Sequence, residues 1–538
     1  MNNILHEDMA QRLKDAFPSP DEIPEDFRLS ASNYTPCYLL DGKVRSWDGP
    51  LAAVYSPICL KQSNVIKRPI IGQVPAMNES TTLAALDAAR RAWNNGRGDW
   101  PQMSFAARIE AVEAFVALML KSREEIIKLL MWEIGKNLEE SRAEFDRTVD
   151  YIGLTVEVLK NADRIGTSFR QRGDMVARVG SAPVGVCLLM GPFNNPLYET
   201  YTMLIPALLM GNTTIVKAPK FGVILHQLLF QPLADCFPPG VINFVYGADN
   251  GADNMSVLMR TGHIDVFSFI GSAGGAAALV QQHPRLFRLR SILSLEAKNS
   301  ALIMADADMA RAVRECVVGA LGFNGQRCTA LKILFVHESV ADEFLKEFCG
   351  AVNALSIGMP WHKGVKLTPL PEFGKVRSMT AYVDDAVAKG GSVVNRNGGT
   401  ACGTLFFPAI VYPVARTAEL YRKEQFGPVV PVCPYGDYEE FLDFVVASDY
   451  GQQVSLFGRN PDKIAKLAGY LENQVCRINL NCKCQRGPDM LPFTGRKDSG
   501  MTTLSISDTL GSFSVPSVVA ARSDSEGPAM IRQIATNR

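Results

Sequence analysis

The stretch Val184–Pro219, VGVCLLMGPFNNPLYETYTMLIPALLMGNTTIVKAP, decides the class of fold. Its two ends, VGVCLLMGP and NTTIVKAP, are short apolar runs typical of buried strands, and YTMLIPALLM between them is helical in pattern. Two further strand-like runs follow, GVINFVYG at 240–247 and IDVFSFIGS at 264–272. Strands that alternate with helices predict a parallel sheet with crossover helices.

The same alternation returns from about Ala301 to Leu480, so a second parallel-sheet unit is expected. Residues 80–160 are mostly helical in pattern, and residues 1–60 are predicted to be an extension of helical fragments and irregular chain. GSFSVPSVVAARS at 511–523 is strand-like, with no helix expected after it. Such a terminal strand can extend another sheet, which favours a homo-oligomer, a dimer or tetramer. The predicted fold is α/β.

Composition narrows the class of function. The chain has 538 residues, with 55 Lys and Arg against 55 Asp and Glu, so we expect two large domains and no nucleic-acid or membrane partner. No secretory leader and no apolar run long enough to span a membrane is evident. The 12 cysteines are scattered, which predicts a reducing, cytoplasmic location. Cys482 and Cys484 lack the second pair that zinc needs, so no metal site is expected.

FNGQRCTA at 323–330 contains the candidate nucleophile, Cys328. The preceding Arg327 can favour the thiolate, which is the reactive form of cysteine. A buried inert cysteine beside a surface arginine is the plainer alternative for a single residue.

Four other segments follow predicted strands or precede one. GPFNNP contains Asn194, whose amide can donate to an oxyanion, and VKAPK contains Lys217 and Lys220, which can meet cofactor hydroxyls or phosphates. Taken alone, GPFNNP is more readily a turn and the lysines of VKAPK are more readily a solvated pair. The other two segments are FIGSAGGAA, a glycine turn with Gly271 and Ser272, and KEQFGPVVP, with Glu424 and Phe426.

In this order and spacing, the five segments resemble the aldehyde dehydrogenase superfamily over about residues 70–520. The resemblance implies Cys328 as nucleophile and Asn194 as oxyanion donor. It implies that Lys217 and Glu424 hold the cofactor riboses, that Phe426 packs near the nicotinamide, and that Gly271 and Ser272 lie by the pyrophosphate.

The resemblance also implies an aldehyde dehydrogenase-like architecture with two Rossmann-like parallel-sheet domains and a small β oligomerisation flap. The N-terminal extension is then 1–60, and the cofactor-binding domain 61–167 with 185–297. The oligomerisation strands are 168–184 and 510–524, the catalytic domain is 298–480, and 481–509 is a return segment lining the substrate site.

Two segments, GQRCTA and CQRGPDMLPFTGRKDSG, are similar to the non-phosphorylating glyceraldehyde-3-phosphate dehydrogenases of that superfamily. The similarity implies that Arg147, Arg327 and Arg486 bind a substrate phosphate, for which guanidinium geometry suits. Arg327 serving only to lower the pKa of the thiol is the alternative. Lys220 stands where NAD-preferring relatives often carry glutamate, which favours NADP, with NAD as the alternative cofactor.

The implied reaction oxidises glyceraldehyde 3-phosphate to 3-phosphoglycerate in glycolysis, without inorganic phosphate, through a thiohemiacetal and a thioester on Cys328. The general base is where the sequence departs from the family, which usually reads E-L-G-G-K. Aligning Lys298 of SILSLEAKNSALI places Ser294 at the base position, whereas aligning Glu296 requires a two-residue deletion. We assign Glu296 as base. Asn195 stands where many members of the phosphorylated-substrate group have tyrosine, and is a further candidate phosphate ligand.

Two alternatives stay open at this stage. One is an aldehyde dehydrogenase for another anionic aldehyde, such as a semialdehyde. The other, prompted by the broken glutamate motif, is a catalytically impaired family member with a binding or structural role.

Overall fold

The parallel sheet predicted around Val184–Pro219 is present as a six-stranded sheet in the computed structural model, which describes residues 2–29, 34–62, 65–166, 169–247 and 252–536. Its strand order is β11-β10-β9-β12-β13-β25, with only the last pair antiparallel. The strands are β9 (Val186–Met190), β10 (Thr213–Lys217), β11 (Ile242–Val245), β12 (Val266–Ile270), β13 (Arg290–Ser294) and β25 (Gly500–Met501). Chain order reverses between β10 and β12 on either side of β9, which is where open α/β sheets bind ligands.

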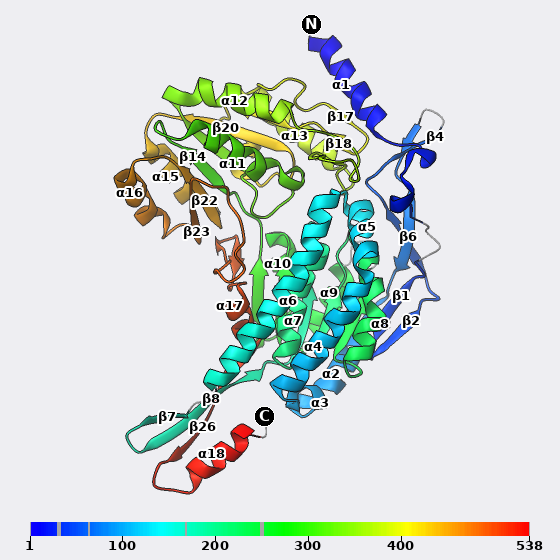
Figure 1. Ribbon diagram of the computed structural model, residues 1–538, viewed down its shortest axis with the longest axis vertical. Helices are drawn as coiled ribbons and strands as arrows, with labels where there is room; N and C mark the ends of the chain where they lie inside the picture. Colours follow the sequence, from blue (N-terminus) through cyan, green and yellow to red (C-terminus); the bar gives the residue numbers. More distant parts are fainter. Residues whose placement is uncertain (1, 30–33, 63–64, 167–168, 248–251, 537–538) are drawn as a thin grey trace.

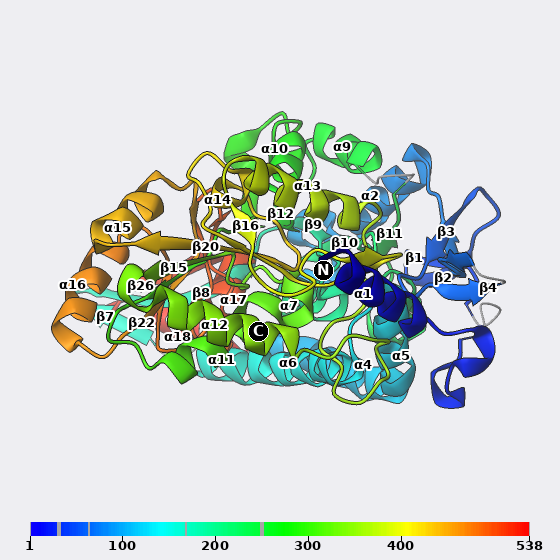
Figure 2. The same cartoon turned by 90° about the horizontal axis from the view of Figure 1, so that it is seen from above.

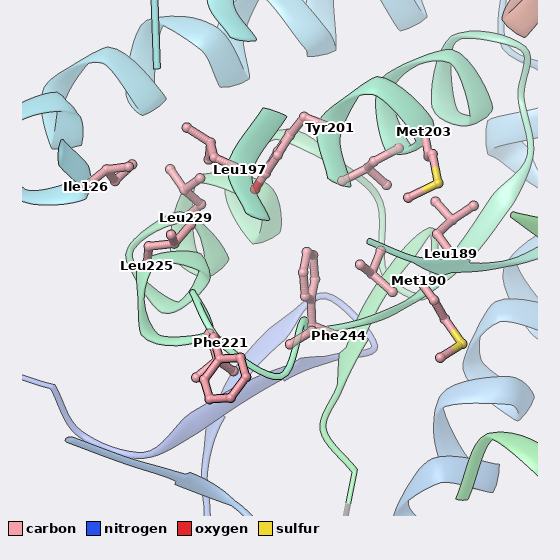
Figure 3. Close-up of a cluster of buried hydrophobic side chains, with 14 of the residues drawn as sticks. Ile126, Leu189, Met190, Leu197, Tyr201, Met203, Phe221, Leu225, Leu229 and Phe244 are labelled. Atoms are coloured by element: carbon pink, nitrogen blue, oxygen red, sulfur yellow. The ribbon is translucent and has the colours of Figure 1, made fainter. Parts of the chain in front are cut away.

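The crossover helix α7 (Pro196–Leu209) lies under this sheet, and every one of its residues is buried. Figure 3 shows side chains of α7, β9 and β11 gathered in one apolar cluster. Long helices cover α7 from outside (Figure 1), and Phe115 stacks on Tyr201 at 5.7 Å between ring centroids. The helices of this unit are α2 (Glu79–Trp93), α3 (Asp99–Gln102), α4 (Phe105–Met119), α5 (Arg123–Ile134), α6 (Leu138–Gly166), α8 (Gln227–Cys236), α9 (Ala252–Arg260) and α10 (Ala273–Val280).

The second predicted unit is a seven-stranded sheet of order β16-β19-β20-β15-β14-β22-β23. Its strands are β14 (Ser300–Ile303), β15 (Ile333–His337), β16 (Ser392–Val393), β19 (Ala409–Tyr412), β20 (Val429–Tyr435), β22 (Gln453–Phe457) and β23 (Arg477–Leu480). Its helices are α11 (Met309–Leu321), α12 (Ala341–Asn353), α13 (Lys375–Ala388), α14 (Glu419–Arg422), α15 (Tyr438–Ala447) and α16 (Pro461–Leu471). Figure 2 shows both sheets from above. Two Rossmann-like parallel-sheet units are thus confirmed.

The predicted flap strands pair as a three-stranded antiparallel sheet of order β26-β8-β7 (Figure 1). They are β7 (Phe169–Arg172), β8 (Met175–Pro183) and β26 (Ser514–Arg522), with α17 (Ile506–Ser512) leading in. The expectation that no helix follows was wrong, because α18 (Gly527–Thr536) turns back and packs on β26. Residue 168 of the predicted flap lies outside the described residues. The domain boundaries and the oligomeric role of the flap stay predictions.

The N-terminal extension contains more β-structure than expected. It begins with α1 (Asn2–Ala16), whose Leu13 is fully buried, as is the neighbouring Phe17. Helix α1 contacts the hairpin of β17 (Ala401–Cys402) and β18 (Leu405–Phe406) in the second unit. The hairpins that follow are β1 (Cys37–Leu40) with β2 (Lys43–Ser46), β3 (Leu51–Tyr55) with β6 (Ile70–Pro75), and β4 (Leu60–Gln62) with β5 (Val65–Lys67). These strands were not predicted because proline and acidic residues interrupt the hydrophobic pattern of this region.

Among the helices of the described residues, none is both long enough and apolar enough to cross a membrane.

Candidate active site

A cavity of about 500 Å³ opens at the carboxyl ends of β9, β10, β12 and β13. The last residues of these strands, Met190, Lys217, Ile270 and Ser294, all line it. Its opposite wall comes from α13 and from residues 424–426 of the second unit. Because parallel strands end at one edge of a sheet, the loops after them converge here. The cavity brings together most of the residues that the sequence singles out.

Asn194 lies in the loop between β9 and α7 and is buried at the cavity wall. Lys136 fixes this loop, because its Nζ donates to the Asn194 carbonyl at 2.8 Å and to Asn195 Oδ1 at 2.7 Å. Glu144 pairs with Lys136 and accepts from two backbone N–H groups at the start of α7. The loop is therefore rigid before any ligand binds. Asn195, predicted to bind substrate phosphate, has its Oδ1 engaged in this support and is not among the residues lining the cavity.

Cys328 lines the same cavity and is partly exposed in it. The chain reaches Cys328 through Phe323 and Asn324, both in the left-handed region with φ of 47° and 55°. Asn299 Nδ2 holds the Cys328 carbonyl at 2.8 Å. Burial and the charge of Glu199 raise the pKa of the Cys328 thiol to about 11. The thiol therefore needs a proton acceptor to react.

Arg327 was expected to bind a substrate phosphate or to lower the pKa of the Cys328 thiol, and its hydrogen bonds are with the backbone of α11. Its Nη2 donates to the carbonyls of Val318 and Gly319, at 2.8 and 3.1 Å. The guanidinium is thus hydrogen-bonded to the last turn of α11, and Arg327 is not among the residues lining the cavity. Burial raises the pKa of the Cys328 thiol overall, although the guanidinium of Arg327 and the thiolate attract each other.

Glu199, in the first turn of α7, is a site residue that the sequence reasoning missed. It is buried, lines the cavity, and forms an ion pair with Arg486. Thr202 Oγ1 donates to its Oε2 at 3.4 Å. The available signal was a glutamate inside an otherwise apolar helix, since an ionised side chain is seldom buried without a role or a partner.

Arg147 and Arg486 are close neighbours, as the predicted phosphate site requires. Their guanidiniums lie 4.2 and 5.1 Å from the ring centroid of Tyr198. Each is already paired with a carboxylate. Arg147 makes a two-point contact with Asp489 at 2.6 and 3.1 Å, and Arg486 is paired with Glu199. Burial raises the pKa of Asp489, but the contacts from Arg147 outweigh it and hold that pKa below its usual range.

Lys217, Lys220, Glu424 and Phe426 all line the cavity. Burial and the neighbouring Lys220 lower the pKa of Lys217 to about 8. Glu424 is paired with Lys332, whose Nζ lies 3.2 Å from Oε1. Phe426 packs edge-on against Phe193, which also lines the cavity, with 5.8 Å between the ring centroids.

Gly271 and Ser272 form the predicted turn between β12 and α10. Ser272 caps the helix by accepting from the Gly275 N–H at 3.2 Å. A Cβ on Gly271 would lie 2.6 Å from the Phe269 ring, so the turn requires glycine.

Ser294 and Glu296 both line the cavity. Strand β13 ends at Ser294, so Glu296 lies in the irregular chain beyond it. Glu296 Oε2 accepts from the Ala273 N–H at 3.0 Å, at the N-terminus of α10. One oxygen of the predicted base is therefore committed to the glycine turn.

The donor set fits a nicotinamide dinucleotide. A helix N-terminus with an open glycine, Gly274, suits a pyrophosphate, and two lysines add positive charge at the end of β10. Glu424 supplies oxygen acceptors, and the cavity extends from this turn to Cys328. Within the part of the chain that the structure describes, no group of three or more His, Cys, Asp or Glu is arranged to hold a metal ion.

Comparisons with known proteins agree with this geometry. The model of the aldehyde dehydrogenase family matches residues 59–519. An NADP-dependent glyceraldehyde-3-phosphate dehydrogenase from Streptococcus equinus is 32% identical over 80% of this chain and 88% of the relative. A malonate-semialdehyde dehydrogenase from Listeria monocytogenes is 27% identical over 87% of this chain and 95% of the relative. The solved structure of the NADP-dependent glyceraldehyde-3-phosphate dehydrogenase from Bacillus halodurans, complexed with NADP, is 27% identical. It superposes with a TM-score of 0.81 and covers 91% of this chain and 99% of that one.

Proposed function

Because the chain belongs to the aldehyde dehydrogenase family, a family of oxidoreductases, we propose that it oxidises an aldehyde to the corresponding acid with NADP. The observation that carries this proposal is the meeting of Cys328 and Asn194 in one cavity with Lys217, Glu424 and Phe426. A nucleophile, an amide donor and a dinucleotide site in one place are the parts that this oxidation needs.

The chain's own groups divide the chemistry as follows. The sulfur of Cys328 adds to the aldehyde carbon, and the carbonyl oxygen becomes an oxyanion. Asn194 Nδ2 and the backbone N–H of Cys328 donate to that oxygen. When bound, the nicotinamide supplies the hydride acceptor that makes the oxidation possible. The acyl group is left on Cys328 as a thioester, which water hydrolyses.

We propose glyceraldehyde 3-phosphate as the substrate, oxidised without inorganic phosphate. The names of the relatives from S. equinus and B. halodurans support this choice. So does Arg147, whose guanidinium lies over Tyr198 and which keeps 40% of its side chain exposed despite its contact with Asp489. NADP preference is supported by Lys220, a cation in the cavity that suits the extra phosphate of NADP.

A second candidate is an aldehyde without a phosphate group. The observation that favours it is charge balance: Arg147 and Arg486 are offset by Asp489 and Glu199, and a bound dianion would compete with both carboxylates. The relative from L. monocytogenes is named for such a substrate, malonate semialdehyde.

An aldehyde panel tests both candidates. Purified protein is assayed for NADPH formation in phosphate-free buffer with glyceraldehyde 3-phosphate, glyceraldehyde, malonate semialdehyde and succinate semialdehyde, and kcat/KM is compared. Highest kcat/KM for the phosphorylated aldehyde, lost in C328A, supports the first candidate. A higher value for an unphosphorylated aldehyde replaces it with the second. No NADPH with any aldehyde refutes the proposed oxidation and leaves the third alternative, a family member without turnover.

We also propose that the protein is a cytoplasmic homo-oligomer assembled through the flap. Val515 and Val518 on β26 support this, with 38% and 61% of their surface exposed in the single chain. Exposed apolar residues on a strand are a pairing surface.

A further inference from the structure

The group that activates the hydrolytic water is the missing part of the site. Ser294 occupies the strand end where the family resemblance leads one to expect the base, and a hydroxyl is a poor proton acceptor. One oxygen of Glu296 is held by the glycine turn, because Oε2 accepts from the Ala273 N–H. The described residues therefore have to supply another carboxylate near the sulfur.

Glu199 meets the geometric requirement. It lines the cavity together with Cys328 and Asn194, although only 6% of its side chain is exposed. Among charged groups, it has the largest effect on the Cys328 thiol, ahead of Arg486 and Glu424. Both side chains line one cavity, so the carboxylate and the sulfur face the same space.

The surroundings of Glu199 fix its carboxylate in one orientation. Arg486 Nη1 donates to Oε2, and Thr202 Oγ1, which donates to the Glu199 carbonyl at 2.9 Å, lies 3.4 Å from the same Oε2. This leaves Oε1 to accept a hydrogen bond from water in the cavity. The guanidinium of Arg486 is itself held between the rings of Tyr198 and Phe493, at 5.1 and 5.0 Å from their centroids.

Glu199 is also built onto the same support as the oxyanion donor. Asn194 precedes α7 and Glu199 lies in its first turn. Lys136 and Glu144 secure the loop and the helix N-terminus together. A carboxylate and an amide donor that are fixed to each other can act on opposite sides of one acyl carbon.

We propose that Glu199 is the general base that activates water for hydrolysis of the acyl group on Cys328. This assignment rests on the proposed function. Glu199 Oε1 takes a proton from water while the water oxygen adds to the thioester carbon. The bond between that carbon and sulfur then breaks, and the carboxylic acid and the Cys328 thiolate form. The acid product or solvent takes up the proton from Glu199, and the step needs no oxidant or reductant.

Other carboxylates in the cavity are less suited to this role. Glu424 is expected to hold a cofactor ribose, which would occupy its oxygens, and Glu372 pairs with Lys375 of α13 at 2.9 Å. Glu296 is engaged with the helix that the cofactor phosphates are expected to approach. The role assigned to Arg486 changes with this proposal, because it positions Glu199 rather than binding a substrate phosphate.

The test separates formation of the acyl group from its hydrolysis. Wild type, E199Q and E296Q are mixed with NADP and the best aldehyde of the panel. The NADPH burst is followed by stopped flow, and acid-quenched protein is analysed by peptide mass spectrometry for an acyl group on Cys328. The matched control is E133Q, which makes the same change at a buried glutamate that accepts three backbone N–H groups elsewhere in the unit.

We expect E199Q to keep a burst of about one NADPH per site, to accumulate acyl-Cys328, and to lose steady-state turnover by about 100-fold or more, the range typical of a general base. E133Q is expected to match wild type in the NADPH burst, in the amount of acyl-Cys328 and in steady-state turnover. S294E in the E199Q background is expected to restore turnover in part. E296Q is expected to accumulate no adduct. Wild-type turnover in E199Q, loss of its burst, or adduct accumulation in E296Q instead would each overturn the assignment.

A second variant keeps the test decisive if E199Q does not fold. E199D retains the charge and the partner for Arg486 but withdraws the carboxylate by about 1.5 Å, one carbon–carbon bond. Because proton transfer needs hydrogen-bond reach, E199D is expected to hydrolyse the adduct at least tenfold more slowly. Hydrolysis at the wild-type rate would overturn the assignment. Failure of wild type itself to form NADPH or acyl-Cys328 would instead refute the proposed function.

Discussion

Replacing Glu199 by glutamine should make Cys328 more reactive towards alkylation, although it slows turnover. Burial and the negative charge of Glu199 hold the pKa of the thiol at about 11. At pH 8, about one thiol in a thousand is then ionised. E199Q removes the negative charge and leaves the cation of Arg486 without that partner, and both changes favour the thiolate.

The magnitude follows from the site. At an effective dielectric constant of about 20, a like charge at about 6 Å, the outer range at which neighbouring charges shift a pKa, changes the free energy of the thiolate by about 3 kcal/mol. That corresponds to about two pKa units, and water entering the cavity screens part of it. We therefore expect the pKa to fall by about one to two units, and alkylation at pH 8 to accelerate by about 10- to 100-fold.

The assay is site-specific alkylation with iodoacetamide, read by peptide mass spectrometry between pH 6 and pH 10. E133Q is the control for loss of a buried carboxylate. For wild type the rate should rise about tenfold per pH unit throughout, because the whole range lies below the thiol pKa. An E199Q profile that coincides with the wild-type one, or is slower at every pH, would refute the electrostatic reasoning.

Four further predictions concern other parts of the chain. K220E should lower the preference for NADP over NAD by about 10- to 100-fold in kcat/KM, because a carboxylate repels the 2′-phosphate; an unchanged ratio would exclude Lys220 from the cofactor site. Burial raises the pKa of Glu133 to about 7, so the wild-type free energy of unfolding should fall by about 1.4 kcal/mol per unit between pH 4.5 and pH 7 from this group. Urea titrations should show a weaker fall in E133Q, and equal slopes would contradict the assignment. D489N should lower the stability by about 1–3 kcal/mol, because it weakens the contact with Arg147, as measured by urea unfolding; no change would mean that the pair is not formed in solution. V518D should shift the oligomer towards monomer in light scattering, and an unchanged mass would remove the flap from the interface.

Much of the fold was predictable because strands and helices alternate with clear hydrophobic patterns. Both parallel sheets, and helices such as α4 and α12, lie where these patterns placed them. The errors fell where local pattern is weak. The strands of residues 37–75 are short and half-exposed. Helix α18 begins only a few residues after β26, where the chain was expected to end as a strand.

The candidate site was predictable only in part. Sequence motifs identify Cys328, Asn194, Lys217 and Glu424, because each stands directly after a strand or in a distinctive loop. Sequence motifs cannot show which of these side chains contact one another in the folded protein. Arg327 is taken up by carbonyls of α11, a contact that depends on how the helix ends. The carboxylate with the strongest electrostatic effect on the nucleophile lies 129 positions away in the chain, and only the packing of α7 brings Glu199 into the cavity of Cys328.

The most direct test is rapid quenching of wild-type, E199Q and C328A protein with NADP and glyceraldehyde 3-phosphate, followed by peptide mass spectrometry. We expect a 3-phosphoglyceroyl group on Cys328, at about one per chain at the end of the burst in E199Q, and none in C328A. An adduct on another cysteine, or NADPH formed by C328A at the wild-type rate, would contradict it.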